Sequence, residues 1–123
     1  MKIYIDYGFD NWNTYINKER SNKYWASSVK KRELDIIRYY TIGIKPITKY
    51  PVKLVFTKYF KDKRQDLDNV RIKGVIDGLV KCGILKNDNL NCITEIVLKC
   101  EFDDTKDGIE IKIEEYVKEI LER

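Results

Sequence analysis

The sequence contains no histidine, and its few cysteines are not paired by spacing. Cys82, Cys92 and Cys100 form no Cys-x-x-Cys motif, so a zinc site of the usual Cys/His kind is excluded. The absence of histidine also excludes Ser-His-Asp and Cys-His triads. Hydrolytic chemistry in this chain must therefore come from carboxylates, lysine and a metal ion.

Long apolar runs are also absent. No run approaches the roughly 20 residues needed to span a bilayer. The apolar residues at the N-terminus alternate with polar ones, which is not the pattern of a signal peptide. With 123 residues, 43% of them hydrophobic, the chain predicts a single domain over 1–123 that is cytoplasmic and has no membrane partner.

Charge is unevenly distributed along the chain. Residues 1–65 carry 15 Lys and Arg against 6 Asp and Glu, a net charge of +9. Residues 66–123 carry 9 against 14, a net charge of −5. This asymmetry suits a protein that grips a polyanion with one region and holds a metal ion with another. Two solvated surfaces without a partner explain it equally well.

Hydrophobic periodicity predicts an α+β domain with a mixed, largely antiparallel sheet and two main helices packed on it. The segment 8–17 has the composition of a turn, and Gly43 with Pro46 ends the first helix. Asp107-Gly108 predicts that the last two strands form an antiparallel hairpin. The expected strands are 1–7, 52–60, 92–102 and 109–117, and the expected helices run from about 23 to 40, from 68 to about 82, and over 115–123.

The helix expected from Asp68 to about Cys82 combines an apolar stripe with a polar one. Asn69, Lys73 and Asp77 follow one another at intervals of four. Gly74 and Gly78 cost roughly 1 kcal/mol each in helix propensity, which indicates close packing of this helix against a neighbour.

Acidic residues at the two ends of this helix are the candidate catalytic and metal-binding groups. Mg²⁺ prefers oxygen ligands, and it can stabilise the charge on a phosphate and lower the pKa of bound water. Asp66, Asp68 and Asp88 could hold such an ion only if the fold brings both ends together, or if a partner subunit supplies some of the ligands. Lys73 could neutralise charge in the transition state, and Asn69 could bond the substrate or a ligand.

The same residues also have a purely structural explanation. Asp68 or Asn69 could cap the helix, with Asp66 adding a favourable charge near its N-terminus. Lys73 and Asp77 could form an ordinary surface pair, and Asn87-Asp88-Asn89 an ordinary turn.

The ordered set of motifs resembles the signature of the RusA family of Holliday junction resolvases. The matching residues are Asp66-Leu67-Asp68-Asn69, a lysine shortly after, Asp77-Gly78-Leu79, Lys81 with Gly83, and Asn87-Asp88. The segment from Tyr15 to Tyr24 also resembles the N-terminal part of phage-encoded members. Together these segments, 66–90 and more weakly 13–35, cover less than half of the chain.

The resemblance implies a homodimeric, Mg²⁺- or Mn²⁺-dependent endonuclease in the cytoplasm of a bacterial host, which cuts branched DNA by paired nicks. By position, the resemblance implies that the metal-binding catalytic acids are Asp66, Asp68 and Asp88 and that the catalytic lysine is Lys73. Two departures stand out: Lys73 and Asp77 each lie one residue further from Asp66 than in the family pattern, and Asn87 replaces a frequent aspartate. Asp77 is interpreted as structural.

Basic residues near the motif and in the N-terminal half are the candidate DNA contacts, expected to bind phosphates with little dependence on sequence. They are Lys18, Arg20, Lys23, Lys30, Lys31, Lys61, Lys63 and Arg64, with Asn69 beside them. The aromatic residues Trp12, Tyr15, Tyr24 and Trp25 could stack at a junction, or form core or a dimer interface. Two other functions compete with the resolvase: a DNA-binding dimer that holds branched DNA without cutting it, and an interaction protein whose acids are only caps and turns.

Overall fold

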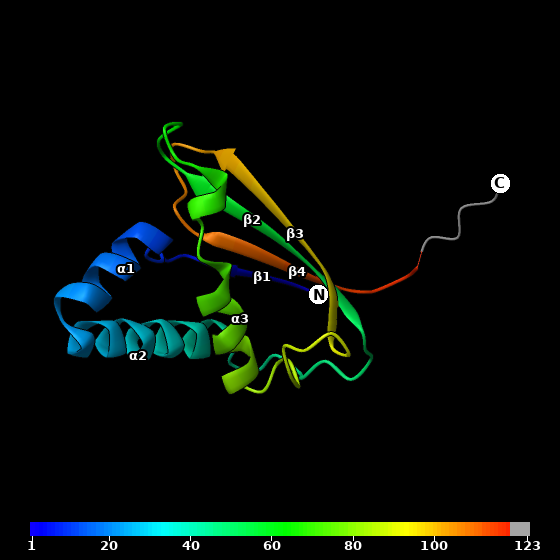
Figure 1. The fold of residues 1–123 in the computed structure, drawn as a ribbon. Helices are drawn as coiled ribbons and strands as arrows, with labels where there is room; N and C mark the ends of the chain where they lie inside the picture. Colours follow the sequence, from blue (N-terminus) through cyan, green and yellow to red (C-terminus); the bar gives the residue numbers. More distant parts are fainter. Residues whose placement is uncertain (119–123) are drawn as a thin grey trace.

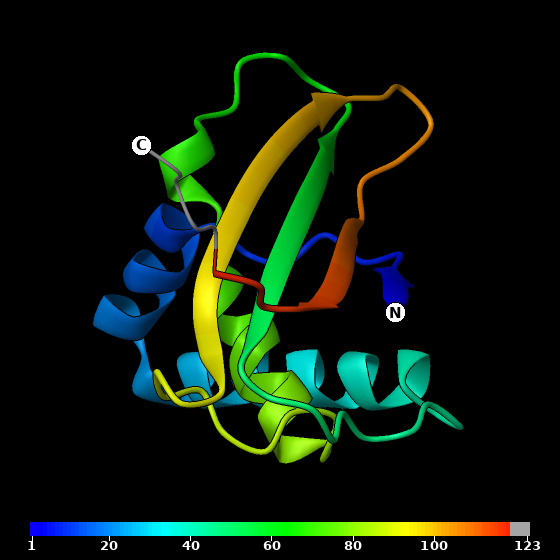
Figure 2. The same ribbon diagram turned by 90° about the vertical axis from the view of Figure 1, so that its right-hand side faces the viewer.

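A computed structural model describes residues 1–118 of the chain. Four strands form one mixed sheet in the order β1-β4-β2-β3. Figures 1 and 2 show the helices gathered on one face of this sheet, while the other face is open. The elements are β1 (Lys2–Ile5), α1 (Trp12–Ser21), α2 (Lys23–Tyr40), β2 (Val52–Phe60), the 3₁₀ turn η1 (Leu67–Asn69), α3 (Ile72–Lys81), β3 (Ile93–Phe102) and β4 (Ile109–Glu115). The predicted α+β class is confirmed.

The sheet pairing corrects the predicted hairpin. β3 pairs in parallel with β2, from Val52 opposite Ile93 to Phe60 opposite Phe102. β4 instead pairs antiparallel with β2 and with β1, so β2 separates the two strands expected to be neighbours. Period-two alternation fixes which face a side chain occupies but does not identify the neighbouring strand. The crossover through α3 decides the pairing, because it returns the chain parallel to β2.

The N-terminal helical region also differs from expectation, because the segment 8–17 is not only a turn. Asn11 caps α1, its side-chain oxygen accepting a hydrogen bond from the Thr14 amide at 2.8 Å. Asn22, with an extended backbone at φ −165° and ψ 111°, then ends α1 and caps α2 through the Tyr24 amide. Asn11, in a segment with the composition of a turn, therefore serves as a helix cap, and Asn22 serves as a second one.

A break divides the predicted helix over 68–82. Residues 67–69 form η1, the backbone of Val70 and Arg71 is non-helical, and α3 begins only at Ile72. The glycine prediction is confirmed, because a Cβ at Gly78 would clash with Ile37 of α2 and one at Gly74 would meet the Arg71 guanidinium. The tight crossing of α2 and α3 thus depends on the missing side chain at Gly78, and the one missing at Gly74 leaves room for Arg71.

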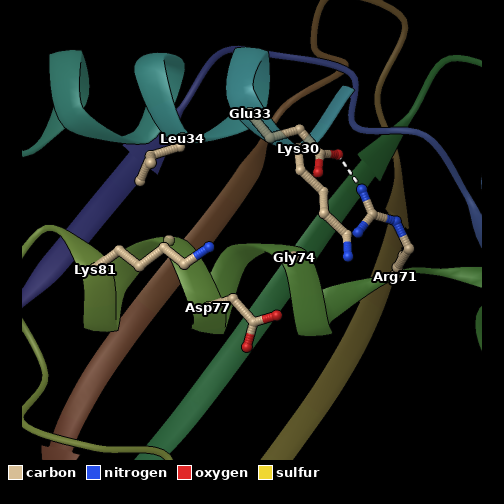
Figure 3. A pocket seen from close by; sticks show the side chains of 8 residues that line it. Lys30, Glu33, Leu34, Arg71, Gly74, Asp77 and Lys81 are labelled. Atoms are coloured by element: carbon tan, nitrogen blue, oxygen red, sulfur yellow. Dashed lines mark hydrogen bonds and ion pairs between the residues drawn. The ribbon is translucent and has the colours of Figure 1, made fainter. Parts of the chain in front are cut away.

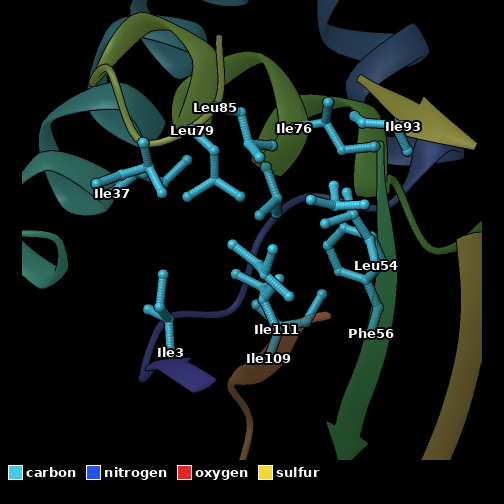
Figure 4. Packing of buried hydrophobic residues seen from close by; sticks show 14 of the residues in the cluster. Ile3, Ile37, Leu54, Phe56, Ile76, Leu79, Leu85, Ile93, Ile109 and Ile111 are labelled. Carbon is cyan, nitrogen blue, oxygen red and sulfur yellow. The ribbon is translucent and has the colours of Figure 1, made fainter. Parts of the chain in front are cut away.

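The core lies between the sheet and the helices (Figure 4). Leu54 and Phe56 of β2 and Ile111 of β4 are fully buried, and they pack with Ile37 of α2 and Leu79 of α3. Burying side chains of this size stabilises the fold by roughly 1.5–3 kcal/mol each. The core therefore holds α3 on the sheet.

The C-terminal helix predicted over 115–123 is not present where the structure describes the chain. β4 continues to Glu115, and residues 116–118 are not helical; residues 119–123 lie outside the described part. Among the described residues, none belongs to a helix both long enough and apolar enough to cross a membrane.

Candidate active site

Asp66 and Asp68 are presented together on η1, which follows the loop after β2. Both residues are exposed, and the Asp66 side chain makes no capping hydrogen bond although it occupies the cap position. The interpretation that Asp68 or Asn69 caps the helix is wrong, because α3 begins at Ile72 with Arg71 in the cap position and no side-chain capping hydrogen bond. Two carboxylates two residues apart on a solvent-facing turn can bind a hard cation.

Asn69 ties this turn to the N-terminal helical region. Its Oδ1 accepts a hydrogen bond from the Asn13 amide of α1 at 3.1 Å. The side-chain oxygen therefore has a structural partner, and this contact joins η1 to α1.

Lys73 lies in the first turn of α3, on its exposed side. Its Nζ is 3.4 Å from Oδ2 of Asp77 one turn later, the i, i+4 surface pair weighed as an alternative from the sequence. Such an exposed pair contributes only about 0.3–0.5 kcal/mol, so the lysine can exchange Asp77 for a phosphate at little cost.

Asp88 lies at the opposite end of α3 from Asp66 and Asp68. The Lys86 amide, two residues earlier, donates to the Tyr50 hydroxyl at 2.8 Å, and the Cys92 carbonyl accepts from the Val52 amide. These contacts hold the segment 86–92 beside the start of β2, whereas Asp66 follows the end of β2. Figures 1 and 2 both show η1 and this loop at opposite ends of α3, a ten-residue helix about 15 Å long.

The three acids consequently do not converge within one chain. Over residues 1–118, no group of three or more His, Cys, Asp or Glu side chains is arranged to hold a metal ion. Mg²⁺ ligands sit about 2.1 Å from the ion, so Asp88 cannot complete a site with Asp66 and Asp68 of the same chain in this arrangement.

Several of the candidate DNA-contacting side chains already have partners. Lys18 pairs with Asp10 at 2.8 Å, and Lys63 and Lys30 lie 4.9 and 5.9 Å from the rings of Phe102 and Tyr15. Arg20, Lys31 and Lys61 are exposed, and Lys23 belongs to α2. Lysines held loosely on aromatic rings keep their charge available to a polyanion.

Arg64 forms a forked pair with Asp62 in the loop that leads to η1. Its Nη2 lies 2.9 Å and its Nε 3.1 Å from Oδ2 of Asp62. These hydrogen bonds lower the pKa of Asp62 and raise the pKa of Arg64. The loop before the two aspartates is thus shaped by a local ion pair.

The aromatic residues of the N-terminal half have different environments. Tyr15 is buried, whereas Tyr24 and Trp25 are exposed, with 58% of Trp25 accessible. In α2 the buried apolar residues include Ala26 and Ile37, whereas Trp25 faces solvent. Of the four aromatics considered, Tyr24 and Trp25 are the most exposed, and Trp12 is half-buried.

The most buried charged residues of this region were missed by sequence reasoning. Arg71, between η1 and α3, forms an ion pair with Glu33 of α2 (Figure 3), and the two residues are only 5% and 3% exposed. Burial raises the pKa of Glu33, and the hydrogen bond and charge of Arg71 oppose that rise. The sequence signal for this burial is helical spacing. Glu33 lies seven residues after Ala26 and four before Ile37, so it shares the face of α2 that these two buried residues occupy.

The pair lines a small cavity between α2 and α3. The cavity measures about 70 Å³ and is bordered by Lys30, Asp77 and Lys81 together with the two glycines of α3. It is large enough only for water molecules.

The fold and the site together define an α+β domain that presents an exposed pair of aspartates beside a basic loop. The family model described as endodeoxyribonuclease RusA matches residues 2–114. The chain therefore belongs to the RusA family of Holliday junction resolving endonucleases. A comparison with curated proteins finds no match.

Proposed function

We propose that this protein is a divalent-metal-dependent endonuclease that resolves Holliday junctions and other branched DNA by paired nicks, in DNA recombination and repair. The observation that carries the proposal is the exposed pair Asp66 and Asp68 on η1, with the Asp66 carboxylate not used as a cap, in a chain of the RusA family. Carboxylates kept in solvent at a helix entrance without a structural task are suited to bind a cation.

In this proposal Asp66, Asp68 and Asp88 hold Mg²⁺, with Mn²⁺ as an alternative. When bound, the ion supplies Lewis-acid stabilisation of the phosphate and a water of lowered pKa. Lys73 neutralises charge on the phosphate after leaving Asp77, its exposed partner at 3.4 Å. The Asn69 amide nitrogen remains free to contact DNA, because only Oδ1 bonds to α1.

A homodimer is part of the proposal, because Asp88 is too distant to act in its own chain. β3 is an edge strand of ten residues with one side unpaired in the sheet. Its helix-side face carries Ile96, 45% exposed, and Phe102, 53% exposed. A long edge strand with an exposed apolar face favours pairing with another chain, and a second copy of this chain offers the same edge.

Two-fold pairing along β3 would also complete the metal site. In an antiparallel pair, the end of β3 in one chain lies next to the start of β3 in the other. η1 lies against β3, and the segment carrying Asp88 directly precedes it. The arrangement therefore moves the partner's Asp88 toward Asp66 and Asp68. It yields two identical sites related by a dyad, which suits the near two-fold symmetry of a four-way junction.

DNA binding is assigned to the basic residues around η1 and on the two N-terminal helices. The proposed contacts are Lys18, Arg20, Lys23, Lys30, Lys31, Lys61, Lys63 and Arg64. Lys61, Lys63 and Arg64 immediately precede the aspartates, so a phosphate held by this loop lies near the proposed metal ligands. Binding through these groups weakens steeply as salt is added.

The test compares a synthetic four-way junction with a linear duplex of the same sequence, each with Mg²⁺ and with EDTA. Paired, Mg²⁺-dependent nicks in the junction alone support the proposal. Asp66→Asn and Asp68→Asn are expected to abolish cleavage and leave the junction gel shift within about twofold, because the acids bind metal rather than DNA. Full nicking by either variant refutes the assignment. A shift without nicking by wild type supports a DNA-binding dimer instead, and the absence of both supports an interaction protein.

A further inference from the structure

Arg71 connects three elements around the exposed aspartates. It follows Asp68 by three residues, and its guanidinium pairs with Glu33 of α2. The guanidinium carbon also lies 4.3 Å from the centre of the Tyr15 ring in α1, and Nε contacts the Asp10 carbonyl at 3.4 Å. The side chain thus contacts α1, α2 and the segment before α1.

The turn that carries Asp66 and Asp68 has few other anchors, one of which is β3, against which η1 lies. The residues from 63 to 68 are exposed, and Asn69 is held by its contact to α1. Beyond η1, the non-helical backbone of Val70 and Arg71 breaks the path into α3. The orientation of η1 therefore depends on where this short segment is attached.

We propose that the Arg71–Glu33 pair is a positioning device that fixes η1, so that Asp66 and Asp68 are preorganised to bind the metal ion; this inference rests on the proposed function. Arg71 and Glu33 touch no substrate and are not ligands. They act through the backbone of 69–71, which places the two carboxylates.

The chemistry of the pair supports positioning rather than stability as its role. Apolar residues of similar volume are often equal to or better than a buried ion pair for stability, because desolvation offsets the attraction between the charges. A guanidinium differs from an apolar group in being planar and directional, with several donors in fixed geometry. It can therefore fix the angle between the turn and the two helices, which a methionine at the same place cannot.

The experiment measures Mn²⁺ affinity by electron paramagnetic resonance, which reports bound metal without DNA and without turnover. The informative variant is the double substitution Arg71→Met with Glu33→Leu, which replaces both charges and leaves none unpaired. We expect a Tm close to that of wild type and Mn²⁺ affinity reduced about tenfold, the lower end of the effect of losing a group that orients ligands. In junction cleavage, the Mn²⁺ concentration for half-maximal rate should rise by the same factor.

A second variant and a matched control separate positioning from folding. Arg71→Lys keeps the positive charge opposite Glu33 but loses the planar guanidinium with its several donors in fixed geometry. This variant should therefore fold and bind Mn²⁺ several-fold more weakly than wild type. Lys2→Gln with Glu110→Gln removes an ion pair of 3.5 Å between β1 and β4, on the sheet face away from η1, and should leave Mn²⁺ affinity unchanged.

The outcomes distinguish this inference from the proposed function. If Asp66→Asn weakens Mn²⁺ binding but every folded Arg71 variant binds it as wild type does, the positioning role is overturned and the nuclease assignment stands. If Asp66→Asn leaves Mn²⁺ binding and cleavage unchanged, the proposed metal site itself is wrong. A loss of affinity in the control equal to that in the double variant also overturns the positioning role.

Discussion

Complementation between two inactive chains tests whether Asp88 acts across a dimer interface. One chain carries Asp66→Asn and the other Asp88→Asn, and each alone is expected to be inactive. α3, a ten-residue helix about 15 Å long, lies between the two positions within a chain. Carboxylate oxygens that share one Mg²⁺ lie within about 4 Å of each other, twice the ligand distance. The structure therefore predicts that each site draws Asp88 from the other chain.

The expected magnitude follows from counting sites. Each site is expected to combine Asp66 of one chain with Asp88 of the other. In a heterodimer, one site therefore contains both substituted residues and the other contains both native residues. Equal mixing makes about half of the dimers heterodimeric, so about a quarter of all sites are intact. Co-refolding the two chains should restore about a quarter of the wild-type nicking rate on a labelled four-way junction. Because each heterodimer has one working site, the first product should be a singly nicked junction rather than a resolved pair.

A different result would refute the reasoning. If Asp88 acts in its own chain, every site in the heterodimer is defective and mixing restores nothing. The control mixes Asp66→Asn with Asp68→Asn, two substitutions on the same turn. No site in any dimer then contains both Asp66 and Asp68, so activity should stay at the level of the single variants.

Three further predictions concern the dimer surface, the helix crossing and the buried acid. Ile96→Lys places a charge on the apolar face of β3 and should shift the protein toward the monomer in sedimentation, with loss of cleavage; an unchanged sedimentation coefficient contradicts the proposed interface. Gly78→Ala brings a Cβ against Ile37 and should lower the free energy of unfolding by about 1–3 kcal/mol in urea titrations, whereas an increase would show that α2 and α3 can separate freely. Burial raises the pKa of Glu33 above the ordinary 4.5, so the folded state holds this proton more tightly than the unfolded chain. The stability of wild type relative to Glu33→Gln should therefore be greatest below pH 4.5, the ordinary pKa, and fall as pH rises through the raised pKa of Glu33. The opposite slope would show that the hydrogen bond and charge of Arg71 outweigh the effect of burial.

The strands and the apolar faces of the elements could be predicted from the sequence with little error. Val52–Phe60 and Ile93–Phe102 occur almost where alternation placed them, and Val75 with Leu79 faces the core as the helical period requires. These patterns are local, because burial repeats every two residues in a strand and every three or four in a helix. The glycines of α3 likewise indicated a close crossing that the structure contains.

The failures involve contacts between distant residues. Asparagines at 11 and 22 indicate turns and caps equally well, and only the finished helices show that they are caps. Arg71 and Glu33 are 38 positions apart, and each alone has the composition of a surface residue. The pairing of β3 with β2 depends on how α3 packs, which no alternation within β3 encodes.

The sequence by itself indicated the family and the candidate site, because the ordered set of motifs from Asp66-Leu67-Asp68-Asn69 to Asn87-Asp88 resembles the RusA signature. The tertiary structure decided how that site can be assembled: it placed Asp88 beyond the far end of α3, exposed the edge of β3, and buried one arginine behind the two aspartates. The reason is physical. Ligand chemistry resides in individual side chains, whereas the distance between ligands depends on the packing of the whole chain.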